Sequence, residues 1–307
     1  MTRKMKRNKK KSMKNKIKTK SLAKENDDLR NELSQLKNKV LRSQRRSRQV
    51  AVSSAVLSMK VPIPRFDGNI AASEKNLGVG RYGCVRLAKI ISSEMIVAEK
   101  VMKENSGDQV NVEATLLFLM SGNPYFPIIF GTTKESIIME FIGSKCGTPG
   151  KTVRALVQSD HHRDWSNIAW QIVEAFQALH GRGVLHNDIH GKNVLFHPVL
   201  QIVKVVDLGL ACLISRPHIH NIVGTEKEAL WDQRYPHVAY EIRKVKGQPS
   251  TTQTDTFSIG VLLCDLGSKA GNKLVYNVGK RLSVNDPTER LSLGEASTAL
   301  AINSRTV

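Results

Sequence analysis

Alternating apolar and polar positions indicate strands in the region that follows residue 68. The run NLGVGRYGCVRLAK (76–89) leads into a stretch in which β-branched and apolar residues alternate roughly with polar ones, and MIVAEKVMK (95–103) is a further strand candidate. Gly78, Gly80 and Gly83 therefore precede a strand, whereas the glycines of a dinucleotide-binding fingerprint open a helix. We predict that they form a β-hairpin turn. Such a turn can place backbone amides over phosphates. The alternative is an ordinary glycine-rich hairpin that binds no phosphate.

Helical periodicity marks two longer segments. VNVEATLLFLM (110–120) places Glu113 on one face with apolar residues at i+3, i+4 and i+7. DWSNIAWQIVEAFQALHGRGVLHND (164–188) repeats apolar residues with the same period and then contains two glycines that end the helix. After these helices, the apolar run VKVVDLGLA (203–211) predicts a buried strand that ends at Asp207. Strands followed by helices predict an α+β fold.

A heptad repeat occupies residues 21–42, where leucines recur every seven residues at 22, 29 and 36. The other core position of the repeat includes Asn26, a polar residue that favours a two-stranded, in-register pair. We expect a short coiled-coil-like helix and a possible homodimer through 21–42. A lone amphipathic helix is the alternative, because three heptads are marginally stable alone.

The net charge of +20 is concentrated in the N-terminal part of the 307-residue chain, where residues 1–60 carry 20 Lys/Arg against 4 Asp/Glu. The first 20 residues hold eleven Lys/Arg and no apolar segment, which excludes a secretory signal. A solvated, disordered arm is one interpretation. A nuclear-import or nucleic-acid-contacting arm is the other.

The prolines and glycine of VPIPRFDG (61–68) indicate a linker that ends where a folded domain begins. No apolar stretch approaches the ~18 residues of a membrane span, so we expect no membrane contact and an intracellular, cytoplasmic or nuclear, protein. The four cysteines have no ligand spacing and are expected to be free thiols. The expected regions are a basic disordered arm at 1–20, a coiled-coil-like helix with a basic end at 21–49, a linker at 50–67 and a folded domain at 68–307.

Five polar residues could carry chemistry. Lys100, on a predicted strand, could bind phosphate oxygens as a compact charge, with Glu113 as the carboxylate that holds it. Asp188, Asn193 and Asp207 supply the hard oxygen ligands that Mg²⁺ prefers, and a carboxylate that can accept a hydroxyl proton. Each residue taken alone could equally be a solvated charge.

The order of these motifs resembles the eukaryotic-type protein kinase family over about residues 68–295. Glycine-rich hairpin, A-x-K, helical Glu, HNDIHGKN and D-x-G follow one another as in that family. Further likenesses are VAYE (238–241), TDTFSIGVLL (254–263) and DPTERLSLGEA (286–296). The resemblance implies a bilobal fold with a small strand-rich N-terminal lobe and a mostly helical, shortened C-terminal lobe. It also implies that Glu241 pairs with Arg290 and that Asp255 holds the backbone of the catalytic loop.

The resemblance further implies ATP-dependent phosphoryl transfer to Ser/Thr hydroxyls of protein substrates, with ATP and Mg²⁺ as cofactors. Asp188 would accept the hydroxyl proton, with Lys100 and His190 as further catalytic residues, and Asn193 and Asp207 would hold the metal. The hinge would be MEFI (139–142), with Met139 as gatekeeper. The residues expected to contact ATP are Leu77, Gly78, Val79, Gly80, Gly83, Val85, Ala98, Lys100, Glu113, Glu140, Ile142 and Leu195.

Two positions of the catalytic loop depart from the kinase pattern. Asn187 replaces the Arg that gathers a phosphorylated activation loop, so activation of that kind is not expected. His190 replaces a Lys that neutralises the transferring phosphate, and it can do so only when protonated, from an ordinary pKa of ~6.5. VGT (223–225) is typical of the Ser/Thr subgroup, and the interval before Arg290 is short for a kinase.

Two other functions fit the same sequence. HNDIHGKN also resembles small-molecule phosphotransferases of the choline or aminoglycoside kinase kind. A pseudokinase scaffold that acts through its basic coiled-coil arm is the non-enzyme alternative. The presence of Lys100, Asp188, Asn193 and Asp207 together favours the active protein kinase.

Overall fold

The computed structural model describes residues 56, 59, 61–80, 83–103, 108–160, 162–220 and 233–304. Backbone contacts divide the chain into two units, Met1–Ala51 and Val52–Val307, and the described residues all belong to the second. Several sequence predictions lie outside the described residues: the basic arm at 1–20, the helix at 21–49, much of the linker at 50–67, and the VGT segment at 223–225.

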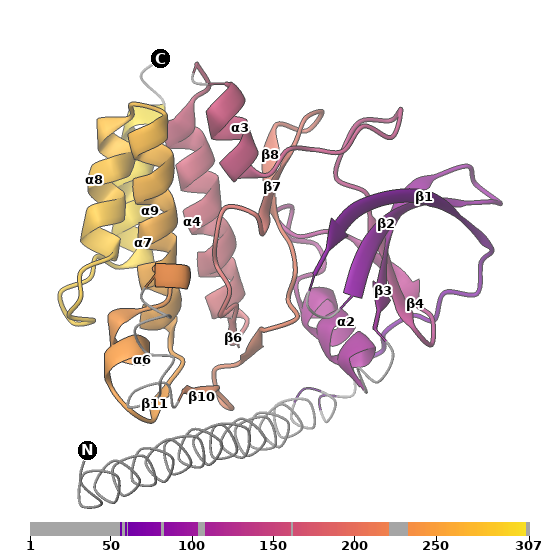
Figure 1. The fold of residues 1–307 in the computed structure, drawn as a ribbon, viewed down its shortest axis with the longest axis horizontal. Coiled ribbons are helices and arrows are strands. Elements are labelled where there is room, and N and C mark those ends of the chain that lie inside the picture. Colours follow the sequence, from indigo (N-terminus) through magenta and orange to yellow (C-terminus); the bar gives the residue numbers. More distant parts are fainter. Residues whose placement is uncertain are drawn as a thin grey trace, which may run out of the picture. The chain divides into compact units, whose positions relative to one another are not determined.

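The strand-rich lobe is built on a five-stranded antiparallel sheet with the order β1-β2-β3-β5-β4 (Figure 1). Its strands are β1 (Ile70–Val79), β2 (Gly83–Ile90), β3 (Ile96–Met102), β4 (Ile129–Thr132) and β5 (Ser136–Glu140). Helix α2 (Gln109–Leu119) packs against β4 and β5. The predicted hairpin at the glycine-rich run is confirmed as β1 and β2, and the predicted helix at 110–120 is confirmed as α2.

Alternation along the strands gives this sheet two different faces. One face carries a small apolar cluster in which Val97 and Ile138 pack with Phe66. The opposite face carries Ala98, which joins the large core shared with the helices. Lys100 follows two residues later and therefore points to the same side as Ala98. The sequence alternation thus directs one charged side chain of β3 toward the other lobe.

The helical lobe is formed by α4 (Trp165–Gly181), α7 (Thr252–Lys269), α8 (Lys273–Leu282) and α9 (Leu293–Ser304), with the shorter α3 (Val153–Ser159) and α6 (Tyr240–Lys244) beside them (Figure 1). The two longest of these helices begin at side-chain caps: Asp164 accepts from the backbone amide of Asn167 at the start of α4, and Thr251 forms a capping box with Thr254 at the start of α7. The short interval before Arg290 contains α8.

Helices α7 and α8 approach closely because glycines line their contact. A Cβ added at Gly267 would lie 2.3 Å from the backbone nitrogen of Tyr276, and one at Gly260 would lie 2.7 Å from the carbonyl oxygen of Gly279. A larger residue at either position would force the two helices apart. The compact helix pair positions the first turns of α7, which carry Asp255.

Three short antiparallel strand pairs accompany the helices of the second lobe. They are β6 (Val184–Leu185) with β9 (Cys212–Leu213), β7 (Val194–His197) with β8 (Ile202–Val205), and β10 (Ile219–His220) with β11 (Gln248–Pro249). The segment between β6 and β7 contains Asp188, and Asp207 lies just beyond β8. The β7–β8 hairpin therefore brings the loops that carry these two acidic residues side by side, where the backbone amide of Val206 donates to the carbonyl of Asn193.

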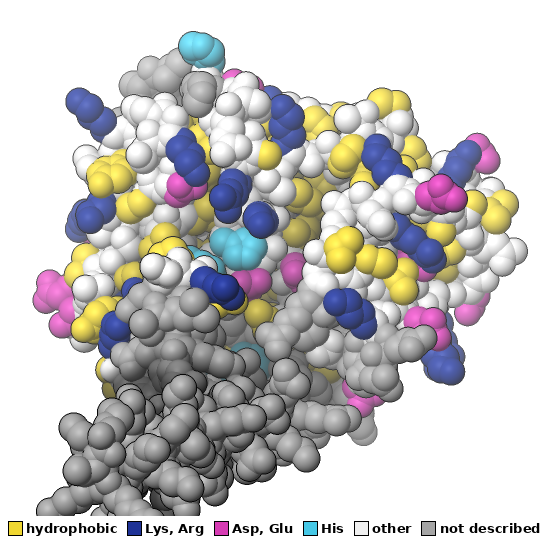
Figure 2. All heavy atoms as spheres, viewed as in Figure 1, with side chains coloured by type: hydrophobic (Ala, Val, Ile, Leu, Met, Phe, Trp, Pro, Cys, Tyr) yellow, Lys and Arg dark blue, Asp and Glu magenta, His cyan; other side chains and the backbone are white. Residues whose placement is uncertain are grey.

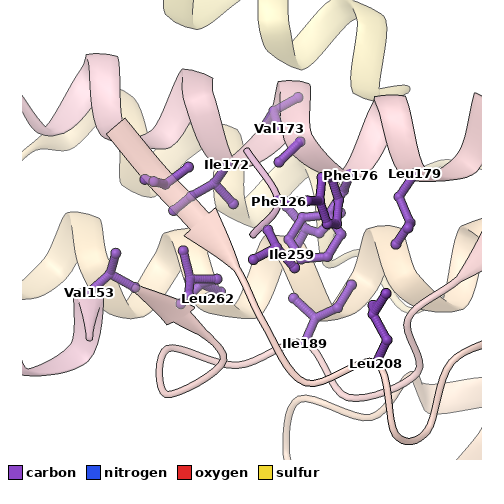
Figure 3. Close-up of a cluster of buried hydrophobic side chains, with 14 of the residues drawn as sticks. Phe126, Val153, Ile172, Val173, Phe176, Leu179, Ile189, Leu208, Ile259 and Leu262 are labelled. Carbon is purple, nitrogen blue, oxygen red and sulfur yellow. The ribbon is translucent and has the colours of Figure 1, made fainter. Parts of the chain in front are cut away.

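The core of the helical lobe reaches these loops through two apolar side chains. Ile189 is 1% exposed and Leu208 is 3% exposed, and each directly follows one of the acidic residues, Asp188 and Asp207. Figure 3 shows both side chains beside the buried cluster that includes Phe126, Phe176, Ile259 and Leu262. Burial of one residue thus fixes the backbone that carries its polar neighbour.

The expected pairing of Glu241 with Arg290 is confirmed. The guanidinium Nη1 and Nη2 of Arg290 donate to the two carboxylate oxygens of Glu241 at 2.8 and 2.7 Å, and the Arg290 side chain is fully buried. Arg290 also donates to the backbone carbonyls of Gln253, Val284 and Asn285. One arginine therefore ties α6 to the start of α7 and to the loop before α9.

The α+β, bilobal fold class predicted from the sequence is confirmed. All four cysteines are free thiols, as expected. Within the described residues, no helix has the length and apolar character needed to cross a membrane.

Glu241→Gln should lower the free energy of unfolding by about 3 kcal/mol, because it removes the counter-charge of a buried guanidinium. Urea denaturation followed by tryptophan fluorescence measures the change. Glu289→Gln is the matched control: this carboxylate is exposed, next to Arg290 in sequence, and its loss should cost less than about 0.5 kcal/mol. Equal stabilities of Glu241→Gln and the unsubstituted chain would contradict the assignment.

Candidate active site

Lys100 joins three segments that are far apart in the sequence. Its Nζ atom lies 2.6 and 2.7 Å from the two carboxylate oxygens of Glu113 on α2, and 2.7 Å from Oδ1 of Asp207. Lys100 and Glu113 are buried, with side chains 8% and 7% exposed, whereas the Asp207 side chain is 41% exposed. The sequence pairing of Lys100 with Glu113 is thereby confirmed as a contact, and Asp207 completes it.

Burial and charge act in opposite directions on this group. Burial of the Lys100 ammonium would lower its pKa, but the carboxylates of Glu113 and Asp207 outweigh this effect and the pKa is raised. Burial raises the pKa of Glu113, while the Lys100 ammonium opposes that rise. The cation is therefore firmly protonated at neutral pH. A protonated lysine beside a partly exposed carboxylate can bind a negatively charged ligand at the open side of Asp207.

The backbone of the segment HNDIHGKN is hydrogen-bonded to a buried carboxylate. Asp255, in the first turn of α7, is 1% exposed, and its two oxygens accept hydrogen bonds from the backbone amides of His186 and Asn187 at 2.8 and 3.0 Å. His180 of α4 contacts the same carboxylate at 3.0 Å. The expectation that Asp255 holds this backbone is confirmed. A loop held by α7 and α4 is fixed relative to the helical core.

Two residues of the site have left-handed backbone conformations. Asn187 has φ 65° and Asp207 has φ 66°, a region that Asn and Asp tolerate better than other non-glycine residues. The side-chain amide of Asn187 donates to the carbonyl oxygen of Leu210 at 3.0 Å and to Sγ of Cys212 at 3.2 Å. The residue that replaces the kinase Arg therefore points inward and links the loop to the segment after Asp207.

Asp188 and Asn193 lie together at the end of this loop. The Nδ2 atom of Asn193 donates to the backbone carbonyl of Asp188 at 2.9 Å and to its Oδ2 atom at 3.1 Å. The backbone amide of Val206 donates to the carbonyl of Asn193 at 2.9 Å, which joins the loop to the residue before Asp207. Because the Asn193 nitrogen is used by Asp188, its amide oxygen is the atom available to a ligand. The structure thus brings Asp188, Asn193 and Asp207 onto linked backbone segments.

Two imidazoles flank the carboxylate of Asp188. Nε2 of His190 lies 3.6 Å from Oδ1 of Asp188, and Nε2 of His237 lies 3.9 Å from the same oxygen. The two rings meet edge to face, with centroids 5.4 Å apart. His190 is the sequence-predicted residue, whereas His237 comes from the segment before α6.

The histidines change the protonation of Asp188. Burial would raise the pKa of this carboxyl, but the contacts of His237, His190 and His186 lower it below its ordinary value. Burial lowers the pKa of His190, although the Asp188 carboxylate opposes that shift. In the protein as it stands, Asp188 is an ionised carboxylate at neutral pH and can accept a hydrogen bond.

The glycine-rich hairpin closes with a hydrogen bond from the backbone amide of Gly80 to the carbonyl of Gly83, at 2.8 Å. A Cβ at Gly83 would lie 2.1 Å from the carbonyl oxygen of Val101, so glycine is required there for β2 to pair with β3. Gly78 faces open space and Val79 is 75% exposed. Steric packing therefore explains Gly83, while Gly78 and Val79 lie on the exposed part of the hairpin.

The apolar residues expected around ATP occupy the sheet and the hairpins. Leu77 and Val85 are half-buried and pack against the core cluster that contains Ala98 and Met139. Leu195 is half-buried on β7, where its backbone bridges to Thr152. The structure thus groups Leu77, Val85, Ala98 and Met139 in one cluster, and Leu195 lies on the β7–β8 hairpin.

The hinge residues have structural partners of their own. The carboxylate of Glu140 accepts from Nζ of the buried Lys204 at 2.8 Å and from the backbone amide of Ile128 at 3.0 Å. The carbonyl of Ile142 accepts from the amide of Gly150 at 2.8 Å. The Glu140 side chain therefore ties the strand-rich lobe to the β7–β8 hairpin, so its expected contact with ATP would have to come from its backbone.

A family model of the protein kinase domain matches residues 71–277, which is most of the chain. The chain belongs to the protein kinase family. The matched region runs from β1 into the first half of α8, and α9 follows it.

Relatives of this kinase include a probable cAMP-dependent protein kinase catalytic subunit from Encephalitozoon cuniculi (strain GB-M1), 24% identical over 211 residues that cover 62% of this chain and 58% of the relative. Calcium-dependent protein kinase 10 of Oryza sativa subsp. japonica is 25% identical over 202 residues, covering 62% of this chain and 32% of the relative. CBL-interacting protein kinase 28 of the same plant is 28% identical over 202 residues, covering 62% and 43%. The matched region thus spans about a third to somewhat over half of these relatives.

Sequence reasoning missed two residues that shape the kinase site. His237 stands four positions before Glu241 without any local spacing that points to Asp188. Lys204 lies among apolar residues on β8 and carries no motif, yet it is 3% exposed and paired with Glu140. Their roles depend on contacts between segments more than 45 residues apart, as the separations of 49 and 64 positions show.

Proposed function

We propose that this chain transfers the γ-phosphoryl group of Mg-ATP to Ser or Thr hydroxyls of protein substrates. The observation that carries the proposal is the meeting of Lys100, Glu113 and Asp207 beside the linked pair of Asp188 and Asn193. Membership of the protein kinase family and the names of its relatives support the same reaction.

The residues of the site fit the Mg-ATP that the proposed reaction requires. Asp207 gives one oxygen to Lys100 and keeps a second, and Asn193 keeps its amide oxygen, so two hard oxygen ligands are left for Mg²⁺. When bound, Mg-ATP supplies the transferable phosphoryl group and neutralises part of its charge. In this proposal Lys100 binds phosphate oxygens while Glu113 holds it in place. Gly78, Val79 and Gly80 cover the phosphates, and Leu77, Val85, Ala98, Ile142 and Leu195 surround the base.

Asp188 is the proton acceptor of the proposal. Its carboxylate is ionised because the neighbouring imidazoles lower its pKa, and Asn193 fixes one of its oxygens at 3.1 Å. An ionised, oriented carboxylate can accept the hydrogen bond of a substrate hydroxyl and then its proton. Asp255 keeps this carboxylate in place through the loop backbone and is a positioning residue.

The proposal extends to the N-terminal part of the chain on sequence grounds alone. A homodimer through residues 21–42 and nucleic-acid or nuclear-import contacts of the basic arm belong to it, as does action inside the cell, where ATP is abundant. None of these depends on the geometry of the kinase domain.

Asp188→Asn and Asp207→Asn should separate catalysis from binding. Asp188→Asn should lower phosphoryl transfer to a Ser/Thr peptide at least about hundredfold, because the amide cannot accept the proton, but should keep Mg-dependent ATP binding. Asp207→Asn should weaken that binding. Radiolabelled transfer and calorimetry are the measurements. Asp265→Asn, on the exposed face of α7, is the control. Full transfer by Asp188→Asn, or none by the unsubstituted chain, would overturn the proposal.

His190 should act on the transferring phosphate and not on nucleotide binding. Where His190 is protonated, His190→Ala should reduce kcat about tenfold at unchanged KM for ATP, because it removes a cation beside the transferring phosphate. Burial lowers the pKa of His190, so this loss should shrink as pH rises. His190→Lys, with a permanent charge, should match or exceed the unsubstituted chain at pH 8. Steady-state kinetics at varied ATP measures both. If His190→Ala has the parent kcat, the residue has no role in transfer.

A further inference from the structure

Two exposed cations lie on the catalytic loop that carries Asp188 and on the helix that contacts this loop. Lys192 belongs to the catalytic loop, and its backbone amide donates to Nδ1 of His190 at 3.3 Å. Arg154 lies at the start of α3, and its backbone amide donates to the carbonyl of Gly191 at 3.1 Å. A Cβ at Gly191 would be 3.0 Å from the Cβ of Arg154, so glycine lets α3 approach the loop closely.

A third cation comes from the other side of the loop. Arg234 is exposed and stands three residues before His237, whose imidazole lies 3.9 Å from the Asp188 carboxylate. The backbone amide of Val238 donates to the carbonyl of Tyr235 at 3.0 Å, which makes a turn directly after Arg234. Arg154, Lys192 and Arg234 thus belong to three segments that each contact the catalytic loop or Asp188, and we name these three residues the basic triad.

The basic triad is uncompensated within the part of the chain that the structure describes. None of its side chains makes an ion pair or a side-chain hydrogen bond with the described residues, whereas the nearby Arg163 pairs with Asp160 and Lys151 donates to Ser159. Asp188 and Asp207 are already engaged by Asn193 and Lys100. Of the other described acidic residues of the helical lobe, all except Glu289 also have partners outside the basic triad: Asp160, Asp164, Glu174, Glu241, Asp255, Asp265, Asp286 and Glu295.

The charge distribution of this face is visible in the space-filling view. Figure 2 shows several Lys and Arg side chains around a histidine in the middle of the face, and acidic side chains directly beside that histidine. Unpaired charges of one sign raise the local concentration of ligands of the other sign. A protein segment that brings its hydroxyl to Asp188 must pass over this surface.

We infer that the basic triad selects protein substrates that carry anionic side chains, acidic or already phosphorylated, next to the target Ser or Thr. The inference rests on the proposed phosphoryl transfer at Asp188. The guanidinium groups of Arg154 and Arg234 match carboxylate and phosphate in a planar fork, and Lys192 adds a mobile point charge. A phosphate, with a charge of about −1.5 to −2, would bind more tightly than a single carboxylate. Substrates with basic flanks are repelled.

The test compares four serine peptides of equal length with the full chain, flanked by Asp, by Ala, by Lys, or by phosphoserine and Ala. The Asp and phosphoserine peptides should each have a kcat/KM about tenfold above that of the Ala peptide, and the Lys peptide should fall below it. Replacing Arg154, Lys192 and Arg234 together by Ala should reduce the preference for Asp over Ala about tenfold, which corresponds to about 1.4 kcal/mol. The Asp and phosphoserine arms decide whether carboxylate or phosphate is preferred.

A matched control removes the same number of charges elsewhere. Lys273, Lys280 and Arg281 lie on α8, on the side of the helical lobe opposite the sheet in Figure 1, and their replacement by Ala should keep the peptide preference. An equal loss in this control, or an unchanged preference after replacing the basic triad, would overturn the inference. The inference would also be overturned if replacing the triad weakened the binding of a single-stranded oligonucleotide but left the binding of all four peptides unchanged.

Binding without turnover separates this inference from the proposed function. Fluorescence anisotropy of the labelled Asp peptide should show about tenfold weaker binding after replacement of the triad, at constant ionic strength. If no peptide is phosphorylated but this difference is found, the proposed function fails and the anion-selective surface stands. If peptides are phosphorylated without any dependence on flanking charge, the inference fails and the proposed function stands.

Discussion

The buried ammonium of Lys100 is the contact on which the rest of the site depends. It bonds to both oxygens of Glu113 and to one oxygen of Asp207, and so holds β3, α2 and the segment after β8 at fixed spacing. A charge buried to this degree is tolerated only when it is paired, because desolvation would otherwise cost several kcal/mol. The position of Asp207 therefore depends on α2 keeping its place against the sheet.

The catalytic loop is built on a second buried charge. Asp255 accepts hydrogen bonds from two amides of the loop. Ile189 and Leu208, which directly follow Asp188 and Asp207, are buried in the helical core. The departures from the kinase pattern are compatible with this frame. Asn187 occupies a left-handed position suited to its side chain and bonds to Leu210, and His190 shares the Asp188 carboxylate with His237. Among the described residues, Arg154, Lys192 and Arg234 around this loop make no ion pair, which is the basis of the substrate preference that we propose.

Ordered motifs made the strand-rich lobe, the contact of Lys100 with Glu113, the bond of Asp255 to the loop and the Glu241–Arg290 pair predictable from sequence. These features have fixed spacings or lie on periodic elements. The contact of His237 with Asp188 and the pair of Lys204 with Glu140 were not predictable, because they join segments through tertiary packing that leaves no local pattern. At Gly83 the sequence and the structure give different reasons for glycine. The motif spacing suggested a phosphate contact, whereas in the structure the carbonyl oxygen of Val101 leaves no room for a side chain at this position.

The most direct test of this account is the rate of phosphoryl transfer after Glu113→Gln, compared with Glu99→Gln. Glu99 is the neighbour of Lys100 on β3, is also buried, and pairs with Arg86 on the opposite face of the sheet. Glu113→Gln should lower kcat/KM for a Ser/Thr peptide at least about hundredfold, or ~2.7 kcal/mol, in a protein that stays folded, whereas Glu99→Gln should change it less than about threefold. Transfer by Glu113→Gln at the parent rate would contradict the central role of the Lys100 contact.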